Sequence, residues 1–329
     1  MARIKYFQAL QNAIQSEMER DENVVLFGED VGESGGIFSQ TRGLYKQFGS
    51  CRVRDTPIAE NGFVSAAVGA AMTGLRPIVE VGFEDFLTAC MDPLVNQAAK
   101  LRFMLGGQVT VPMVVYTFGG GGLNAGPQHS QSFVSWFSQV PGLKVVLPAT
   151  PADVFSMTKA AVRDDNPVIV LLSKKLIGSS GEVDTDKNNF DIDLESAYVT
   201  DQGDDVTLVA FGAMVIAAIE ARSKLAEIGC NAEVVNGCCA NPYDIATIKT
   251  SVKKTGRLAV VHEAHLPCGP GAEIIASLVE EDTSIFKLPP IRITPPFAPS
   301  PFAPNLEREY LPSGESIFRS VSSMLNRHS

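Results

Sequence analysis

The stretch that decides the fold is VPMVVYTF at residues 111–118, which runs directly into four glycines at 119–122. An uncharged run of this length is typical of a strand buried on both faces in the middle of a parallel sheet. Glycines let backbone approach a ligand closely, and ligands of open α/β sheets bind at the carboxyl ends of the strands. The stretch therefore predicts an α/β fold with a binding edge after residue 118.

Outward from this strand, apolar runs alternate with amphipathic segments, which is the pattern of a mainly parallel sheet flanked by helices. Pro93 should kink the helix in which it lies or mark its true first turn. In the first half we expect strands at 23–27, 77–83, 144–148 and 167–173, and helices at 7–18, 63–75, 86–104 and 153–163.

The second half repeats the alternation on a smaller scale, ending in a proline-rich arm at 291–304 and a last helix at 315–325. A polar segment rich in Asp and Asn separates the halves, as expected of a linker. We therefore predict one α/β domain at 1–185, a linker at 186–203 and a second α/β domain at 204–329. In that second domain, strands are expected at 206–211, 231–235 and 258–263, and helices at 214–228, 244–254 and 271–279.

Composition excludes several classes of protein. The net charge of −10 disfavours nucleic acid and anionic membranes as partners, and no run approaches the length of a membrane span. The six cysteines form no CxxC pair and no regular spacing, so neither a disulfide scaffold nor a zinc ribbon is indicated. The reduced interior of a cell, and the cytoplasm in particular, fits best.

One carboxylate stands out in DTPIAENGF at residues 55–63, where Glu60 lies between apolar neighbours at the start of a very apolar helix. Loss of hydration there should raise its pKa and suit it to exchange protons near neutral pH. The alternative is a helix cap, in which Glu60 or Asn61 satisfies the first backbone amides.

Two further candidates follow predicted strands. Glu29 lies in the turn after the strand at 23–27, where a solvated loop acid is the alternative, and His129 lies in the glycine loop. No GxGxxG register fits that loop and no GK[ST] follows it, so it is neither a dinucleotide fingerprint nor a P-loop. A functional and a structural role for His129 are both open from position alone.

His262, His265 and Cys268 recur at three-residue intervals and could ligate zinc. Three-residue spacing aligns side chains on a helix, whereas this segment is a strand that turns into a Pro/Gly loop. We therefore do not expect a metal site there.

Taken together, six ordered motifs resemble the β subunit of thiamine-diphosphate-dependent 2-oxo acid dehydrogenases, the transketolase-like decarboxylating component of pyruvate, branched-chain and acetoin dehydrogenase complexes. The resemblance covers nearly the whole chain. It implies a pyrimidine-binding domain followed by a transketolase C-terminal domain. The motifs are Gly28–Gly32, Asp55–Gly62, Gly69–Pro77, Gln128–Ser132, Pro141–Val146 and Arg163–Val168.

The resemblance also implies roles for single residues. Glu60 matches the glutamate that hydrogen-bonds N1′ of the cofactor's aminopyrimidine and thereby activates it for attack on a 2-oxo acid. Phe86 matches an aromatic residue stacked on that ring, although a core residue of a first helical turn is the alternative. His129 matches a histidine that orients substrate or assists acyl transfer to a lipoyl arm, and Glu29 matches an acid near the cofactor.

Five residues resemble a potassium site built largely from backbone oxygens, the ligand type that hard cations take. An ordinary helix-to-strand turn explains the same residues. They are Met113, Ala161, Val162, Asp164 and Asn166.

The absence of one family motif is as informative as the motifs that are present. Thiamine enzymes hold Mg²⁺ and the diphosphate through a Gly-Asp-Gly motif followed further on by Asn, and this sequence lacks it. The resemblance then implies an α₂β₂ heterotetramer in which an α subunit holds the diphosphate and Mg²⁺. This chain would be inactive alone, and its acidic C-terminal domain would dock on a lipoyl acyltransferase core with a basic binding module.

The C-terminal half departs from the family at 236–244, NGCCANPYD, where relatives usually carry Asp-Leu-Arg-Thr before Pro-Leu-Asp. Loss of that arginine removes an expected interface anchor. Pro127-Gln128-His129 lacks the tyrosine that branched-chain members of the family often carry beside this histidine, so the resemblance is nearer to pyruvate or acetoin enzymes, and we expect pyruvate. Two rival functions are a non-catalytic scaffold or regulatory subunit and a single-chain transketolase-like enzyme.

A mitochondrial matrix location would require a transit peptide that has been removed.

Overall fold

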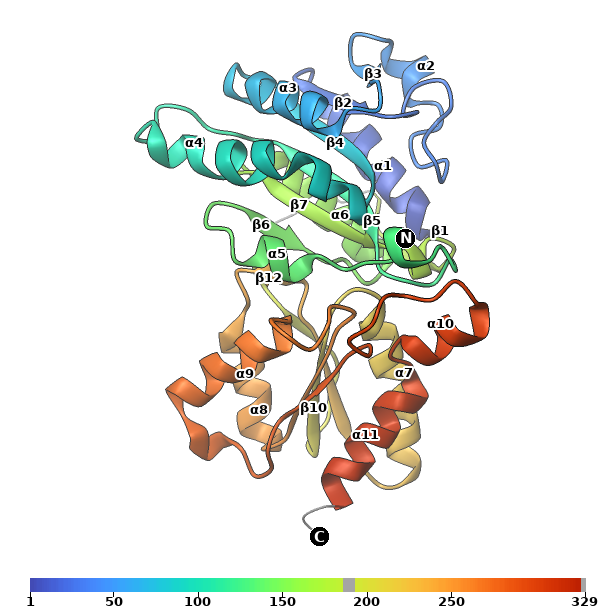
Figure 1. Ribbon diagram of the computed structural model, residues 1–329, viewed down its shortest axis with the longest axis vertical. Coiled ribbons are helices and arrows are strands. Elements are labelled where there is room, and N and C mark those ends of the chain that lie inside the picture. Colours follow the sequence, from blue (N-terminus) through green and yellow to red (C-terminus); the bar gives the residue numbers. More distant parts are fainter. Residues whose placement is uncertain (186–192, 327–329) are drawn as a thin grey trace. The chain divides into compact units, whose positions relative to one another are not determined.

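The computed structural model describes residues 1–185 and 193–326, which divide into two compact units. The first unit comprises Met1–Gly119 and Trp136–Leu194, and the second comprises Gly120–Ser135 and Glu195–Ser329. Strands alternate with helices in both (Figure 1), which confirms the predicted α/β class. Of the expected linker at 186–203, residues 186–192 lie outside the described residues.

The first unit is built on a parallel sheet in the order β6-β7-β5-β4-β2-β3. The predicted central strand, β5, is buried along its whole length and pairs on both sides, with Val114 opposite Val168 and Ile78 opposite Val114. These strands are β2 Val24–Gly28, β3 Val53–Asp55, β4 Arg76–Phe83, β5 Val114–Gly119, β6 Lys144–Val146 and β7 Val168–Ser173.

Helices cover both faces of this sheet (Figure 1), with α1 packed on α6 and with α3 packed on the segment that leads into α4. Apolar side chains therefore fill two layers, as expected for strands that are buried on both faces. The helices of this part of the chain are α1 Tyr6–Arg20, α2 Leu44–Phe48, α3 Glu60–Met72, α4 Ala99–Met104, α5 Val134–Ser138 and α6 Pro151–Arg163.

The expected continuous helix at 86–104 was wrong. A 3₁₀ segment covers Glu84–Cys90, a π-helical segment covers Pro93–Ala98, and only Ala99–Met104 is α-helical. The widened turn begins at Pro93, which has no backbone N–H to donate to an α-helical ladder. The predicted distortion at this proline is confirmed, but it is larger than a kink.

An antiparallel strand pair was missed. Strand β1, Ala2–Lys5, pairs with β8, Ser180–Val183, so that Ala2 lies opposite Val183. The sequence predicted a helix at 7–18 and no strand before it. Four polar or mixed residues carry no strand pattern of their own, and their pairing depends on a segment far along the sequence.

The second unit holds a sheet in the order β14-β13-β10-β11-β9, parallel except for the edge strand β9. Helices α8 and α9 lie on one side of it, and α7 and α11 lie on the other (Figure 1). The elements are β9 Tyr198–Asp201, β10 Val206–Ala210, α7 Ala213–Glu227, β11 Ala232–Asn236, β12 Cys239–Asn241, α8 Ile245–Thr255, β13 Leu258–Val261, α9 Pro270–Glu281, β14 Ile291–Ile293, α10 Pro304–Tyr310 and α11 Gly314–Asn326. The strand and helix predictions for this half are confirmed within a few residues. Across the described ranges, no helix combines the length and apolar character that crossing a membrane requires.

Candidate functional site

Glu60 is the first residue of helix α3, three residues before the predicted start. The residue before it, Ala59, occupies the N-cap position, and no side chain caps the helix. The capping role considered for Glu60 or Asn61 is therefore not observed. Glu60 is half-buried, and the apolar helix ends before Gly74, whose φ of +104° suits glycine best.

Glu29 lies at the end of β2 and close enough to Glu60 for their charges to interact. Burial raises the pKa of Glu29, and the negative charges of Glu60 and Asp30 raise it further. One carboxylate oxygen of Glu29, Oε1, is buried without a hydrogen-bond partner among the described residues. The structure thus brings two of the predicted acids together, and it leaves on one a buried acceptor that a bound group could satisfy.

The motif before Glu60 fixes this turn. The backbone N–H of Gly32 donates to Asp55 Oδ1 at 2.7 Å, and the N–H of Thr56 donates to the carbonyl of Gly28 at 2.9 Å. A Cβ at Gly32 would lie 2.3 Å from the Asp55 carboxylate, so any larger residue there would displace this side chain from its hydrogen bond. The Gly28–Gly32 and Asp55–Gly62 motifs are therefore two loops that are hydrogen-bonded to each other. One carries Glu29 and the other carries Glu60.

A third acid, Glu80, was not predicted. It lies in the middle of β4, only 2% exposed, and accepts hydrogen bonds from the Tyr116 hydroxyl and the Gln40 side-chain amide. Burial raises the pKa of Glu80 to about 7, and the charges of Glu29 and Asp30 add to the rise while both hydrogen bonds oppose it. The sequence does contain a signal for Glu80, since a charged residue within a buried parallel strand needs hydrogen-bond partners.

We expect Glu80→Gln to remove a pH dependence of stability. The folded state holds a proton on Glu80 that the unfolded chain releases between the ordinary glutamate pKa of 4.5 and about 7, so stability falls as pH rises through that window. The rise corresponds to about 3 kcal/mol, and Gln mimics the protonated acid. Urea unfolding at pH 5 and pH 8 should show a larger loss for the wild type than for Glu80→Gln, with exposed Glu22→Gln as control. Parallel losses in wild type and Glu80→Gln would contradict this.

Phe86 lies in the 3₁₀ segment, not in an α-helix as expected. It is half-buried, and its ring packs edge-to-face on Phe83 with 5.8 Å between centroids. Phe83 in turn packs on Phe38, which also contacts Phe118 of the central strand at 4.8 Å. An aromatic row anchored in the core therefore supports Phe86 and leaves part of its surface accessible.

His129 belongs to the second unit and ends a short 3₁₀ turn, Pro127–His129. The next helix, α5, begins five residues further on, at Val134. The His129 N–H donates to the carbonyl of Gly126 at 3.3 Å, and its side chain is half-buried. His129 is thus held by the glycine loop itself.

Two family models match this chain, one in each half of the sequence. Residues 2–179 match the family model described as "Transketolase, pyrimidine binding domain", and residues 195–317 match "Transketolase, C-terminal domain". The chain is 41% identical over 330 residues to the acetoin:2,6-dichlorophenolindophenol oxidoreductase subunit beta of Bacillus subtilis, with 96% of each chain covered. It is 42% identical over 313 residues to the pyruvate dehydrogenase E1 component subunit beta-1 of Arabidopsis thaliana, covering 94% of this chain and 86% of that one.

The chain belongs to the β-subunit family of the transketolase-like 2-oxo acid dehydrogenases. This confirms the family that the six motifs indicated. The pyruvate dehydrogenase E1 subunit beta of Bacillus subtilis is 36% identical over 325 residues, with 99% of both chains covered. A solved structure titled "Split gene transketolase, inactive beta4 tetramer" matches with a TM-score of 0.79 and 20% identity over 98% of each chain, which supports the fold.

In this family member, the residues that resemble a potassium site lie where α6 ends and where β5 and β7 begin. Arg76 Nη1 donates to the carbonyls of Val162 and Asp164, at 3.0 and 3.1 Å, and the carbonyl of Met113 accepts from Val168 N–H at 3.0 Å. Each carbonyl oxygen keeps a second lone pair, so the donor type still fits a hard cation. Ala161 also presents its carbonyl, to Asp164 N–H, while the Asn166 side chain accepts from Arg102.

Contacts with nearby residues account for His262 and for part of the segment 236–244. His262 is buried, its Nδ1 lies 2.9 Å from the carbonyl of Ala264, and burial lowers its pKa to about 4. In the part of the chain that the structure describes, no cluster of three metal-ligating side chains occurs, His262, His265 and Cys268 included. In the departing segment 236–244, Cys238 has a φ of +50° and Asp244 caps helix α8 through Thr247 N–H at 2.9 Å.

Proposed function

We propose that this chain is the β subunit of a heterotetrameric thiamine-diphosphate-dependent 2-oxo acid dehydrogenase. Its reaction would be oxidative decarboxylation of a 2-oxo acid, with pyruvate favoured, and transfer of the acyl group to a lipoyl acyltransferase. The observation that carries this proposal is the placement of Glu60 on the first turn of α3 beside Glu29, within a pyrimidine-binding domain.

When bound, thiamine diphosphate supplies the electron sink for loss of carbon dioxide. Glu60 would hold a proton at a carboxyl oxygen and share it with the cofactor's ring nitrogen N1′. Phe86 offers a supported aromatic face for stacking, and the buried, unpartnered Oε1 of Glu29 offers an acceptor nearby. His129 would orient the substrate or assist acyl transfer from its imidazole.

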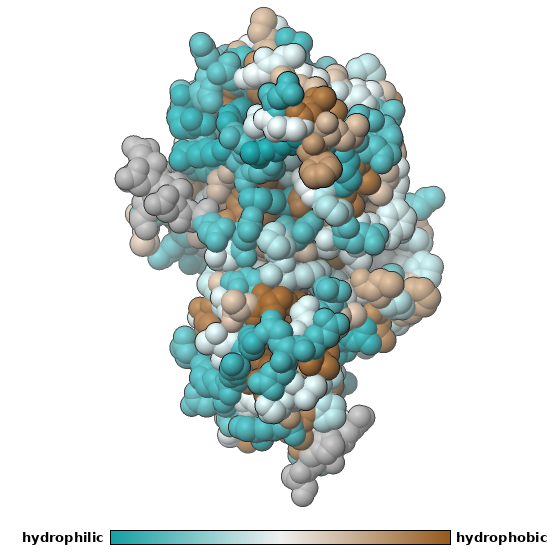
Figure 2. All heavy atoms as spheres, turned by 90° about the vertical axis from the view of Figure 1, so that its left-hand side faces the viewer, coloured by the Kyte–Doolittle hydropathy of each residue, from teal (hydrophilic) through white to brown (hydrophobic). Residues whose placement is uncertain are grey.

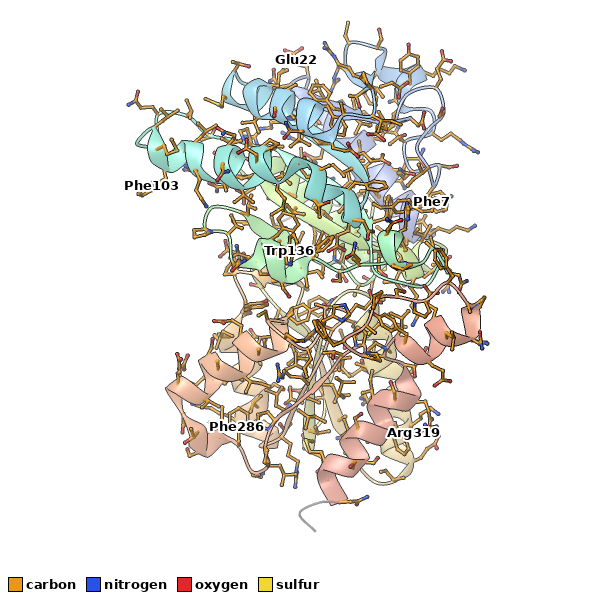
Figure 3. All side chains as sticks on the ribbon, in the orientation of Figure 1. Phe7, Glu22, Phe103, Trp136, Phe286 and Arg319 are labelled. Atoms are coloured by element: carbon orange, nitrogen blue, oxygen red, sulfur yellow. The ribbon has the colours of Figure 1, made fainter. Side chains whose placement is uncertain are left out.

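An α subunit is the proposed partner, in an α₂β₂ assembly, and it would hold the diphosphate and Mg²⁺ because the sequence lacks the Gly-Asp-Gly motif. Exposed apolar side chains support a partner. Ile58, before α3, is 84% exposed, and Phe103, in α4, is 89% exposed. Phe103 projects away from the rest of α4 (Figure 3), and Figure 2 shows apolar side chains gathered on this face of the first unit. Surfaces of this kind mark protein interfaces.

Three further points are proposals that follow from family membership. The acidic C-terminal domain would dock on the lipoyl acyltransferase core, and the location would be the cytoplasm. Potassium would bind among the carbonyls of Met113, Ala161, Val162, Asp164 and Asn166. A melting temperature that is higher in KCl than in NaCl at equal ionic strength would support that site, and equal values would contradict it.

The chain should be active only with its partner. We expect no decarboxylation by the purified chain, and thiamine-diphosphate-dependent turnover when it is co-purified with the α subunit and supplied with an artificial electron acceptor. A panel of pyruvate, branched-chain 2-oxo acids and acetoin identifies the substrate. Acetoin is the second candidate, because relatives that are 41% and 40% identical are acetoin oxidoreductase subunits. Activity of the chain alone, or an inactive assembly with every substrate, would overturn the proposal.

A further inference from the structure

The glycine loop that carries His129 is attached to helix α10 by one carboxylate. Glu307, in the first turn of α10, is only 3% exposed. Its Oε1 accepts from Gly122 N–H and its Oε2 accepts from Asn124 N–H, both at 3.0 Å. Two backbone amides on one carboxylate form the strong, charge-assisted type of hydrogen bond, with a geometry that fixes direction as well as distance.

The glycines of this loop are explained by side chains of the same unit that approach its backbone. A Cβ at Gly121 would lie 2.9 Å from a methyl of Leu311, one turn along from Glu307. At Gly126 it would lie 2.2 Å from the ring of Phe302, and at Gly120 it would lie 1.9 Å from the carboxylate of Glu263. Side chains of the same unit thus lie against the loop backbone at these three glycines, and Gly120 and Gly126 also have positive φ angles that favour glycine.

Backbone hydrogen bonds within the loop connect the segment that Glu307 holds to the turn that carries His129. Gly120 N–H donates to the carbonyl of Gln131 at 3.0 Å, and His129 N–H donates to the carbonyl of Gly126. Between these closures, the positive φ angles of Gly122, Asn124 and Gly126 set the path of the chain. Glu307 accepts from two amides that lie between Gly120 and Gly126, so it holds the segment that leads to the His129 turn.

We propose that Glu307 is a positioning residue that holds the glycine loop and, through it, places the His129 imidazole for the reaction. This rests on the proposed function, in which His129 acts on the substrate or on acyl transfer. Glu307 would contact neither substrate nor cofactor. Its effect would pass through the loop backbone alone.

The test compares Glu307→Gln with Glu309→Gln, an exposed acid two residues further along the same helix. Gln turns a donor toward one of the two amides, so the loop should loosen while the charge change is the same in both variants. Hydrogen exchange of residues 120–131 in the full chain should become at least tenfold faster in Glu307→Gln alone. Gly121→Ala is a second variant, because its Cβ would lie 2.9 Å from a methyl of Leu311 and 3.3 Å from Oε1 of Glu307. It should therefore push the loop away from α10 while the carboxylate itself is kept, and we expect the same faster exchange of residues 120–131.

Turnover of the reconstituted assembly separates positioning from general destabilisation. We expect Glu307→Gln to lower kcat at least tenfold with thiamine diphosphate affinity unchanged, and to lower it less than twofold further in a His129→Ala background. Unchanged loop exchange, or an equal loss of kcat in both backgrounds, would overturn the role of Glu307. Normal turnover of His129→Ala would overturn the role proposed for His129 as well, and so distinguishes the two failures.

Discussion

Glu60→Gln is expected to lower turnover of the reconstituted assembly by about 10²–10⁴-fold, the contribution of a positioned proton donor. Gln keeps the size and hydrogen-bonding reach of Glu at the first position of α3 but has no carboxyl proton to share. Because no side chain caps this helix, the substitution should leave the fold of α3 intact. The measurement is kcat with the preferred substrate and an artificial electron acceptor.

The matched control is Glu22→Gln, an exposed acid at the edge of the first unit (Figure 3), which should turn over at the wild-type rate. Gel filtration of both variants with the α subunit should give the same assembly as the wild type. Near-normal turnover of Glu60→Gln in an intact assembly would mean that Glu60 does not activate the cofactor. A scaffold or regulatory role would then become the better interpretation.

Glu17→Gln should destabilise the first unit by about 3 kcal/mol. Glu17 is fully buried between α1 and α6, where Arg163 Nη2 lies 2.7 Å from Oε1 and Arg20 Nε lies 2.7 Å from Oε2. Lys159, itself 2% exposed, has its ammonium 3.9 Å from Oε1. Gln in place of Glu17 removes the negative charge that three cations share, and Lys159 among them is buried. The two arginines can still reach water, so we expect the lower end of the range for a broken buried ion pair.

Urea unfolding followed by a probe in the first unit measures this effect. Glu19→Gln on the same helix is the control, because Glu19 is exposed and its removal should change stability by no more than about 0.5 kcal/mol. The free energy of unfolding could instead fall as little for Glu17→Gln as for the control. The ion pairs of Glu17 would then contribute to the specificity of packing and not to stability.

Local sequence pattern predicted the features that depend on local chemistry. The uncharged run at 111–118 is the central strand, and the apolar helix that begins near Glu60 presents that acid next to Glu29. Features set by distant pairing were missed. The β1–β8 pair joins segments from opposite ends of the first unit, and Glu80 is satisfied by Gln40 and Tyr116, which no spacing in the sequence connects to it.

The glycine loop shows a different limit of sequence reasoning. Its composition predicted that a ligand approaches the backbone closely, and composition does not specify what approaches. The structure assigns that place to Glu263, Leu311 and Phe302, all from the C-terminal half of the sequence. A residue such as Glu307 has no motif of its own, and only its two bonds to loop amides distinguish it from the exposed acids around it.

We propose that this chain provides only the aminopyrimidine half of a cofactor site that it shares with the α subunit. Calorimetric titration of thiamine diphosphate with Mg²⁺ tests it most directly, using the chain alone, the α subunit alone and the reconstituted assembly. We predict tight, stoichiometric binding by the assembly, weakened in Glu60→Gln, and no tight binding by the chain alone. Stoichiometric, tight binding of thiamine diphosphate by the chain alone would mean that the chain holds the whole cofactor without a partner.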